Sequence, residues 1–232
     1  MEGGVAHFGE QRPMDADVFQ QGLWEILPDG RTVGRLVLRS PGANMISLQF
    51  DVFDLAEEVV LFIFTPERDQ FLGGFTAANH GSDGGLATAV LPRDAVVVEI
   101  ILPAGRNATS RVHLASLTHG HYSLFETVSH PGAAQPRDID PGYQAQPCHV
   151  NVNCPEANDW QQEKHAVALF LRPDGQGCTG TLLNNTQTPG TPYFMIAHHC
   201  FAGDPAQWVF YFNYFFARSR RTPRSTLQTI AG

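Results

Sequence analysis

Short apolar runs separated by glycine and proline turns are the feature that most limits the fold of this sequence. Between residues 30 and 127 the runs are strand-sized, and some alternate apolar with polar side chains, as at 46–50. No amphipathic helix longer than two turns is evident. Turns at such intervals are typical of an antiparallel β-sandwich. We therefore predict an all-β fold whose strands include 35–38, 46–50, 59–64, 96–102 and 111–115.

The composition excludes several classes of protein. With 43% hydrophobic and 16% charged residues, the 232-residue chain can fill a core and is not disordered. The formal charge of −8 argues against nucleic acid as a partner. No apolar run approaches the roughly 20 residues of a membrane helix, so no membrane partner is expected. The basic run formed by Arg218, Arg220, Arg221 and Arg224 is expected to be a solvated loop.

Charge and cysteine content divide the chain. Residues 1–127 carry 16 acidic and 8 basic residues and no cysteine, whereas all four cysteines follow residue 147. Residues 1–29 are expected to be an irregular segment without the basic start and apolar core of a signal peptide. Residues 30–127 form the predicted sandwich domain. Residues 128–147, with four prolines, are predicted to be a linker open to proteases, and 148–232 form a second domain.

The second domain is also predicted to consist of strands. Residues 166–171 precede a turn at 173–175 and are expected to pair with 180–183, and further strands are predicted at 193–197 and 208–214. A hairpin between the segments 178–185 and 193–200 would bring Cys178 and Cys200 close enough to form a disulfide, worth about 3 kcal/mol for a loop of that length. The disulfide would hold the adjacent histidine on a rigid strand end, as a general base requires.

Two sequence blocks in this domain carry a family resemblance. They are Cys-Thr-Gly-Thr-Leu-Leu-Asn-Asn at 178–185 and Tyr-Phe-Met-Ile-Ala-His-His-Cys at 193–200. Together with the Cys148 to Cys154 segment and the Asn-Tyr pair at 213–214, they resemble the bacterial lysyl endopeptidases, which are secreted trypsin-like serine proteases of the chymotrypsin fold. The resemblance covers about residues 143–232. More weakly, the preceding sandwich looks like the pro-region of such proteases.

The resemblance implies a serine-type endopeptidase precursor, or zymogen. It implies secretion, a polypeptide substrate, no cofactor, and contact between the pro-domain and the protease domain. Residues 148–232 would then be an incomplete trypsin-like protease domain, the first part of a chymotrypsin-type double β-barrel. The residues that set specificity for the substrate belong to the second barrel, so specificity for lysine is only an analogy.

Individual residues take roles from the same resemblance. His199 corresponds to the catalytic general base, and Cys178 and Cys200 correspond to the disulfide beside it. The partner of Cys148 would lie beyond residue 232. Cys154 is expected to be unpaired, because Ser219 occupies the place of its partner.

The other parts of a serine protease site are not recognisable in the sequence. After His199 the only aspartate is Asp204, which follows too closely to be the catalytic one, and the only serines are Ser219 and Ser225. We therefore expect an N-terminal fragment that ends before the catalytic Asp and Ser and is inactive as given. Strands 193–197 and 208–216 would be left exposed without the second barrel.

Two other interpretations remain open at this point. The His-His-Cys triplet and the Cys148 to Cys154 segment together could bind zinc, but cysteine separations of 6, 24 and 22 do not fit the usual close pairs. We therefore expect no metal. The whole chain could instead be a non-catalytic β-sandwich binding protein that carries a protease remnant. His119 and His121 are interpreted as hydrogen-bonded residues of the sandwich.

Overall fold

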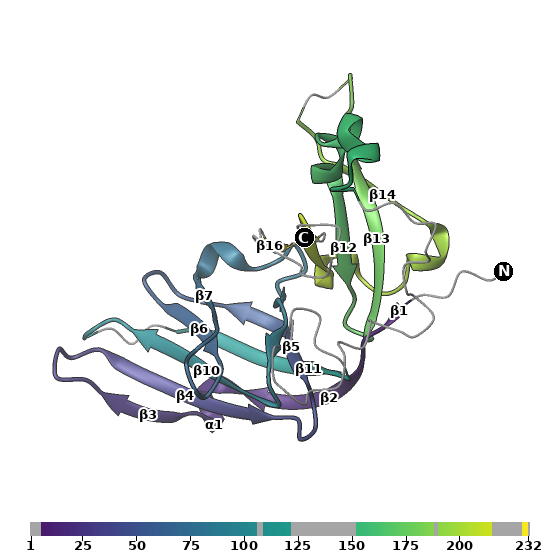
Figure 1. Cartoon of the computed structure of the whole chain (residues 1–232). Helices are drawn as coiled ribbons and strands as arrows, with labels where there is room; N and C mark the ends of the chain where they lie inside the picture. The colour runs from purple at the N-terminus through teal and green to yellow at the C-terminus, as the bar shows by residue number, and fades with distance from the viewer. Residues whose placement is uncertain (1–5, 106–108, 122–151, 188–189, 215–228, 232) are drawn as a thin grey trace.

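The described residues of the protein form three antiparallel sheets (Figure 1). The computed structural model describes residues 6–105, 109–121, 152–187, 190–214 and 229–231. Nearly all regular structure within these residues is strand, which confirms the all-β prediction. The proline-rich segment 128–147 lies outside the described residues, as do Cys148, Ser219, Ser225 and the basic run at 218–224.

Two of the sheets form a sandwich. One has the order β3-β4-β10-β6-β7, and the other has the order β2-β11-β5-β8, with β9 also paired to β5. The bounds are β2 Gly9–Asp17, β3 Leu23–Ile26, β4 Thr32–Arg39, β5 Met45–Asp54, β6 Val60–Phe64, β7 Phe71–Phe75, β8 Leu86–Ala87, β9 Leu91–Pro92, β10 Ala95–Leu102 and β11 Arg111–Gly120.

The sandwich core lies between these two sheets. In β10 the alternate residues Val96, Val98 and Ile100 are fully buried and meet Leu48 of β5 and Leu114 of β11 in one cluster. Because successive strand residues point to opposite faces, one β-branched row of β10 faces this core. At roughly 1.5–3 kcal/mol for each large apolar side chain, such burial supplies most of the drive for folding.

Residues 9–17 and 23–26 form strands, contrary to the sequence prediction of an irregular segment over 1–29. Strand β2 pairs with β11 from His113 to Gly120, and β3 pairs with β4. The strand character of β2 was hidden because one of its faces is exposed and polar and because Pro13 lies next to a bulge in the β11 register. The short helix α1 (Val18–Gln21) follows, with the Asp17 side chain accepting from two of its backbone N–H groups.

The third sheet is formed mainly by the C-terminal residues. Its order is β1-β13-β12-β15-β16, with β14 paired to β13, and it is an open sheet, not a closed barrel. The predicted hairpin is present, because β12 and β13 pair through Phe170 and Cys178. The bounds are β1 Ala6–His7, β12 Val167–Leu171, β13 Gln176–Leu183, β14 Tyr193–Ile196, β15 Val209–Phe212 and β16 Thr229–Ala231.

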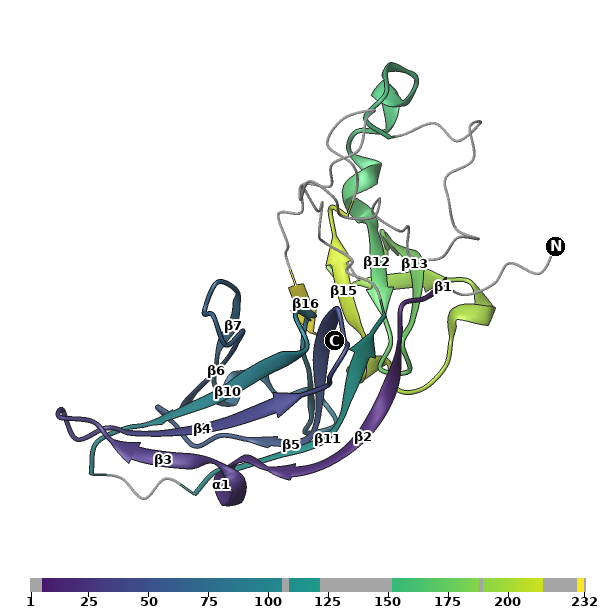
Figure 2. The same ribbon diagram turned by 60° about the horizontal axis from the view of Figure 1, so that its bottom comes forward.

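The third sheet stands on the end of the sandwich, and the chain segment of β1 and β2 runs from one to the other (Figure 2). A second apolar cluster fills this junction. It joins Phe8 and side chains of the sandwich to the buried face of β12 and β15; its members are Phe8, Met45, Ala87, Ala89, Val90, Leu169, Leu171, Val209 and Tyr211. We call this set the junction core.

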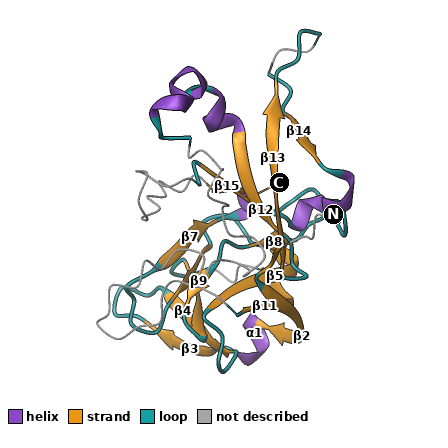
Figure 3. Ribbon diagram, turned by 45° about the vertical axis from the view of Figure 1, so that its right-hand side comes forward, coloured by secondary structure: helices purple, strands orange, loops and turns teal. Residues whose placement is uncertain are grey.

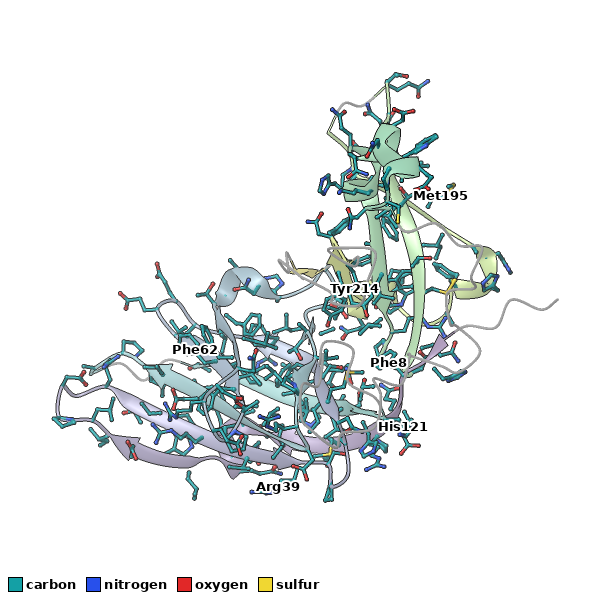
Figure 4. The ribbon with its side chains drawn as sticks, viewed as in Figure 1. Phe8, Arg39, Phe62, His121, Met195 and Tyr214 are labelled. Carbon is teal, nitrogen blue, oxygen red and sulfur yellow. A yellow bond between two sulfur atoms is a disulfide. The ribbon has the colours of Figure 1, made fainter. Side chains whose placement is uncertain are left out.

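The junction core corrects the prediction that both aromatic-rich strands are left exposed. Val209 and Tyr211 of β15 are buried against the sandwich. The prediction holds in part for β14, where Tyr193 and Met195 are about half exposed. In Figure 4, Phe8 lies near the junction, whereas Met195 lies on the part of the third sheet that projects away from the sandwich.

The helical segments are short (Figure 3). Five 3-10 turns connect the strands of the described residues: η1 Ala77–Asn79, η2 Pro155–Trp160, η3 Glu163–Ala166, η4 His198–Cys200 and η5 Pro205–Gln207. In the part of the chain that the structure describes, no helix is long and apolar enough to cross a membrane.

Candidate active site

The histidine pair of the second sequence block forms the turn η4, directly after strand β14. The turn is closed by two backbone hydrogen bonds: the N–H of Cys200 donates to the carbonyl of Ala197 (2.9 Å), and that of Phe201 donates to the carbonyl of His198 (3.1 Å). His198 and His199 are exposed, whereas Cys200 is buried. The turn therefore presents two imidazoles to solvent from a backbone that is fixed at its far end.

The structure contains the disulfide between Cys178 and Cys200, with the two Cα atoms 6.0 Å apart. It links η4 to strand β13 inside an aromatic cluster. In that cluster the rings of Phe170 and Trp208 stack at 4.8 Å, and Phe194 packs edge-on against Phe170. Since stacked and edge-on aromatic pairs have preferred geometries, the turn rests on a well-packed apolar base.

His199 lies beside this disulfide, with a ring nitrogen within 4.8 Å of both sulfur atoms. Among the described residues, its imidazole has no hydrogen-bond partner. An exposed neutral imidazole has a lone pair that can accept a proton. Chemically, the turn offers a general base on a rigid support.

The same three residues are the one set of potential metal ligands with suitable spacing in the described part of the chain: Cys178, His199 and Cys200. A zinc ion binds cysteine as the thiolate. Both sulfur atoms here are consumed by the disulfide, which leaves a single imidazole. The donor set therefore does not fit a zinc site as long as the disulfide is present.

Residues 143–231 match the family model of the lysyl endopeptidase C-terminal domain. This match supports a lysyl endopeptidase-related family. The match includes the strands of the third sheet from β12 to β16, the disulfide and His199, and it excludes the sandwich.

Two other residues singled out in the sequence lie in the region that matches this family model. Asp204 begins η5, and its carboxylate accepts a hydrogen bond from the N–H of Ala206 (3.0 Å), so it caps a turn. Cys154 is a free, half-buried cysteine at the start of η2. Neither side chain has a hydrogen bond to His199 among the described residues.

Sequence reasoning missed Arg172, which contacts the histidine turn. This arginine follows β12 and is only 5% exposed. Its Nη1 donates to the carbonyl oxygen of Cys200 (2.7 Å), and its Nη2 donates to Asp174 (2.5 Å) and Gln176 (2.6 Å). The pattern in the sequence that could have indicated this role is a basic residue at the end of an apolar strand, followed by an Asp-Gly turn that can accept its hydrogen bonds.

The sandwich has ionisable groups of its own. The pKa of His113 is raised by hydrogen bonds to Asp15 (2.9 Å) and Asp51 (2.6 Å). The pKa of His119 is lowered, chiefly by burial, and its Nδ1 is hydrogen-bonded to the hydroxyl of Ser40 (2.8 Å). The interpretation of His119 as a hydrogen-bonded sandwich residue is thus confirmed.

Proposed function

We propose that residues 148–232 form the histidine-bearing part of a trypsin-like serine endopeptidase of the lysyl endopeptidase type, with His199 as its general base. One observation carries the proposal. The exposed His199 imidazole has no hydrogen-bond partner among the described residues, and it sits on a turn that the disulfide fixes to β13. A general base needs this combination of a free lone pair and a fixed position.

In this role His199 would take the proton of a serine hydroxyl as that oxygen attacks the peptide carbonyl, and it would then give the proton to the leaving amine. The reaction also needs the serine, a carboxylate that orients the imidazole, and donors for the oxyanion. Among the described residues, no hydroxyl or carboxylate is hydrogen-bonded to His199. We propose that residues 1–232 alone do not hydrolyse peptides at an enzymatic rate.

The sandwich fits the role of a pro-region in a secreted zymogen. Its contact with the third sheet is extensive, because it shares the junction core and adds β1 to the edge of β13. A pro-region that packs on the protease domain in this way would act within the precursor. Cleavage in the segment 128–147 would break the covalent connection between the two parts of the chain.

The test is hydrolysis of lysyl and arginyl esters and amides. Two preparations are compared: the protein isolated from the organism that encodes it, and recombinant residues 1–232. Each is assayed beside its His199→Ala variant, with His198→Ala as the matched control on the same turn. We expect turnover that depends on His199 but not on His198 in the isolated protein, and background rates in recombinant residues 1–232.

The outcomes separate the parts of the proposal. Turnover by the isolated protein that survives His199→Ala would contradict the role of His199. No turnover in the isolated protein would contradict the peptidase function and favour a non-catalytic binding protein. Turnover by residues 1–232 that is lost with His199→Ala would show that the chain contains its own nucleophile.

A further inference from the structure

The backbone of Cys200 is attached to the β12–β13 hairpin at a second point, besides the disulfide. The Cys200 side chain is bonded to Cys178 on β13, while its carbonyl oxygen accepts the hydrogen bond from Arg172. The two attachments come from opposite strands of one hairpin. Since Cys200 directly follows His199, they fix the backbone at the end of the turn that carries the imidazole.

The guanidinium of Arg172 is held in place from its other side. Asp174 accepts from both Nε (3.2 Å) and Nη2, and Gln176 also accepts from Nη2. A planar guanidinium that is bound at two edges has little rotational freedom. The hydrogen bond from Arg172 to the Cys200 carbonyl is itself buried, so bulk water does not compete for it and the donor has a defined direction.

The turn that carries these partners is also the place where the sandwich touches the hairpin. The hydroxyl of Thr118 on β11 donates to the carbonyl of Pro173 (2.9 Å). The backbone N–H groups of Phe8 (2.8 Å) and Gly9 (3.2 Å) donate to the carbonyl of Gly175. The segment 173–175 is therefore bound by the sandwich on one side and is continuous with Arg172 on the other.

We propose that Arg172 is a positioning residue for His199, and that through the turn at 173–175 it makes the position of His199 depend on the docked sandwich. This inference rests on the proposed role of His199 as the base. It adds a route by which the N-terminal half of the chain acts on the site. If the sandwich moved away from the turn, Asp174 and Gln176 would be free to move. The Arg172 guanidinium, which donates to Cys200, would then lose its fixed position.

The experiment follows the imidazole of His199 in recombinant residues 1–232 by NMR, with isotope-labelled histidine. The His199 signals are assigned by their loss in His199→Asn. In Arg172→Gln we expect these signals to shift or split, while those of His113 in the sandwich stay in place. Arg172→Lys retains one charged donor and is expected to give a smaller change. The matched control is Arg31→Gln, which removes an exposed arginine paired with Asp29 and should leave His199 unchanged.

Two further measurements complete the test. Thr118→Val, which removes the sandwich donor to the turn, should move the His199 signals in the same direction as Arg172→Gln. Reduction of the Cys178–Cys200 disulfide by dithiothreitol should be about tenfold faster in Arg172→Gln, because a charged hydrogen bond that holds the turn closed is lost.

Unchanged His199 signals in a folded Arg172→Gln protein would overturn the proposal. If that variant does not fold, Arg172→Met, which also removes the donor, takes its place, and native His199 signals in it together with native reduction kinetics would overturn the proposal. Unchanged signals in Thr118→Val would remove the link to the sandwich. None of these measurements uses peptidase activity, so their failure is distinct from failure of the proposed function.

Discussion

The hydroxyl of Tyr211 joins the third sheet to the sandwich, and its removal gives a defined prediction. Tyr211 is fully buried, and its oxygen accepts a hydrogen bond from the backbone N–H of Val90 (3.0 Å). Tyr211→Phe keeps the ring in the junction core and removes this acceptor. The N–H of Val90, itself only 8% exposed, then loses its protein acceptor.

A buried donor that loses its partner costs about 1–3 kcal/mol, so we take about 2 kcal/mol for Tyr211→Phe. For a chain of this size, 1 kcal/mol corresponds to about 2–4 °C in Tm, which gives a decrease of about 4–8 °C. Burial raises the pKa of Tyr211 far above its usual value. The hydroxyl therefore stays protonated, and the decrease should be the same at pH 6 and pH 9.

The assay is thermal and urea unfolding followed by tryptophan fluorescence and circular dichroism. Tyr193→Phe is the matched control, because Tyr193 is 52% exposed and its substitution should change the free energy of unfolding by less than about 0.5 kcal/mol. Equal stability of Tyr211→Phe and the native chain would refute the reasoning. So would separate unfolding of the two halves in the native chain, since a shared junction core predicts one transition.

Three further predictions follow from other features. In a urea titration, Gly175→Ala should destabilise the chain by more than about 1 kcal/mol, because Gly175 has φ +80° and an added Cβ would clash with a β2 carbonyl group. The control Gly105→Ala, at φ +71° with open space around it, should cost less in the same titration. The raised pKa of His113 means that its ion pairs stabilise the fold fully below about pH 6.5 and lose this effect as the pH rises through the raised value. The Tm advantage of the native chain over His113→Asn should therefore shrink between pH 6 and pH 9, and a constant difference would contradict this. Non-reducing peptide mapping should find the Cys178–Cys200 cross-link, and the double substitution to serine should cost about 3 kcal/mol in urea unfolding; two free thiols in oxidising buffer would contradict the fold of this region.

Much of the sandwich was predictable because its strands carry local signals. The β-branched run predicted as a strand at 96–102 is β10 almost residue for residue, since such side chains favour a pleated, buried strand. The disulfide and the histidine turn were also recognisable, because the hairpin of β13 and β14 brings their cysteines together.

What the sequence did not reveal depends on contacts between distant segments. Alternation in β15 indicates that Val209 and Tyr211 share a buried face, but not that this face packs on the sandwich. Arg172 read as an ordinary charged residue next to a turn, because its target is a backbone carbonyl 28 residues away. Backbone acceptors have no sequence signature, so a side chain that acts on one is visible only in the folded chain.

The pairing of β1 with β13 also has a consequence for the order of folding. Ala6 pairs with Gly177, so these partners leave the ribosome roughly 170 residues apart, and contacts of such long range slow folding. The sandwich strands from β2 to β11 can close over their own core first, as N-terminal units do during synthesis. Until β12 and β15 arrive, Phe8 and Val90 have no cover from the third sheet. We therefore expect the nascent chain to expose apolar surface around Phe8 and Val90. We also expect refolding in two kinetic phases, of which docking of the third sheet is the slower.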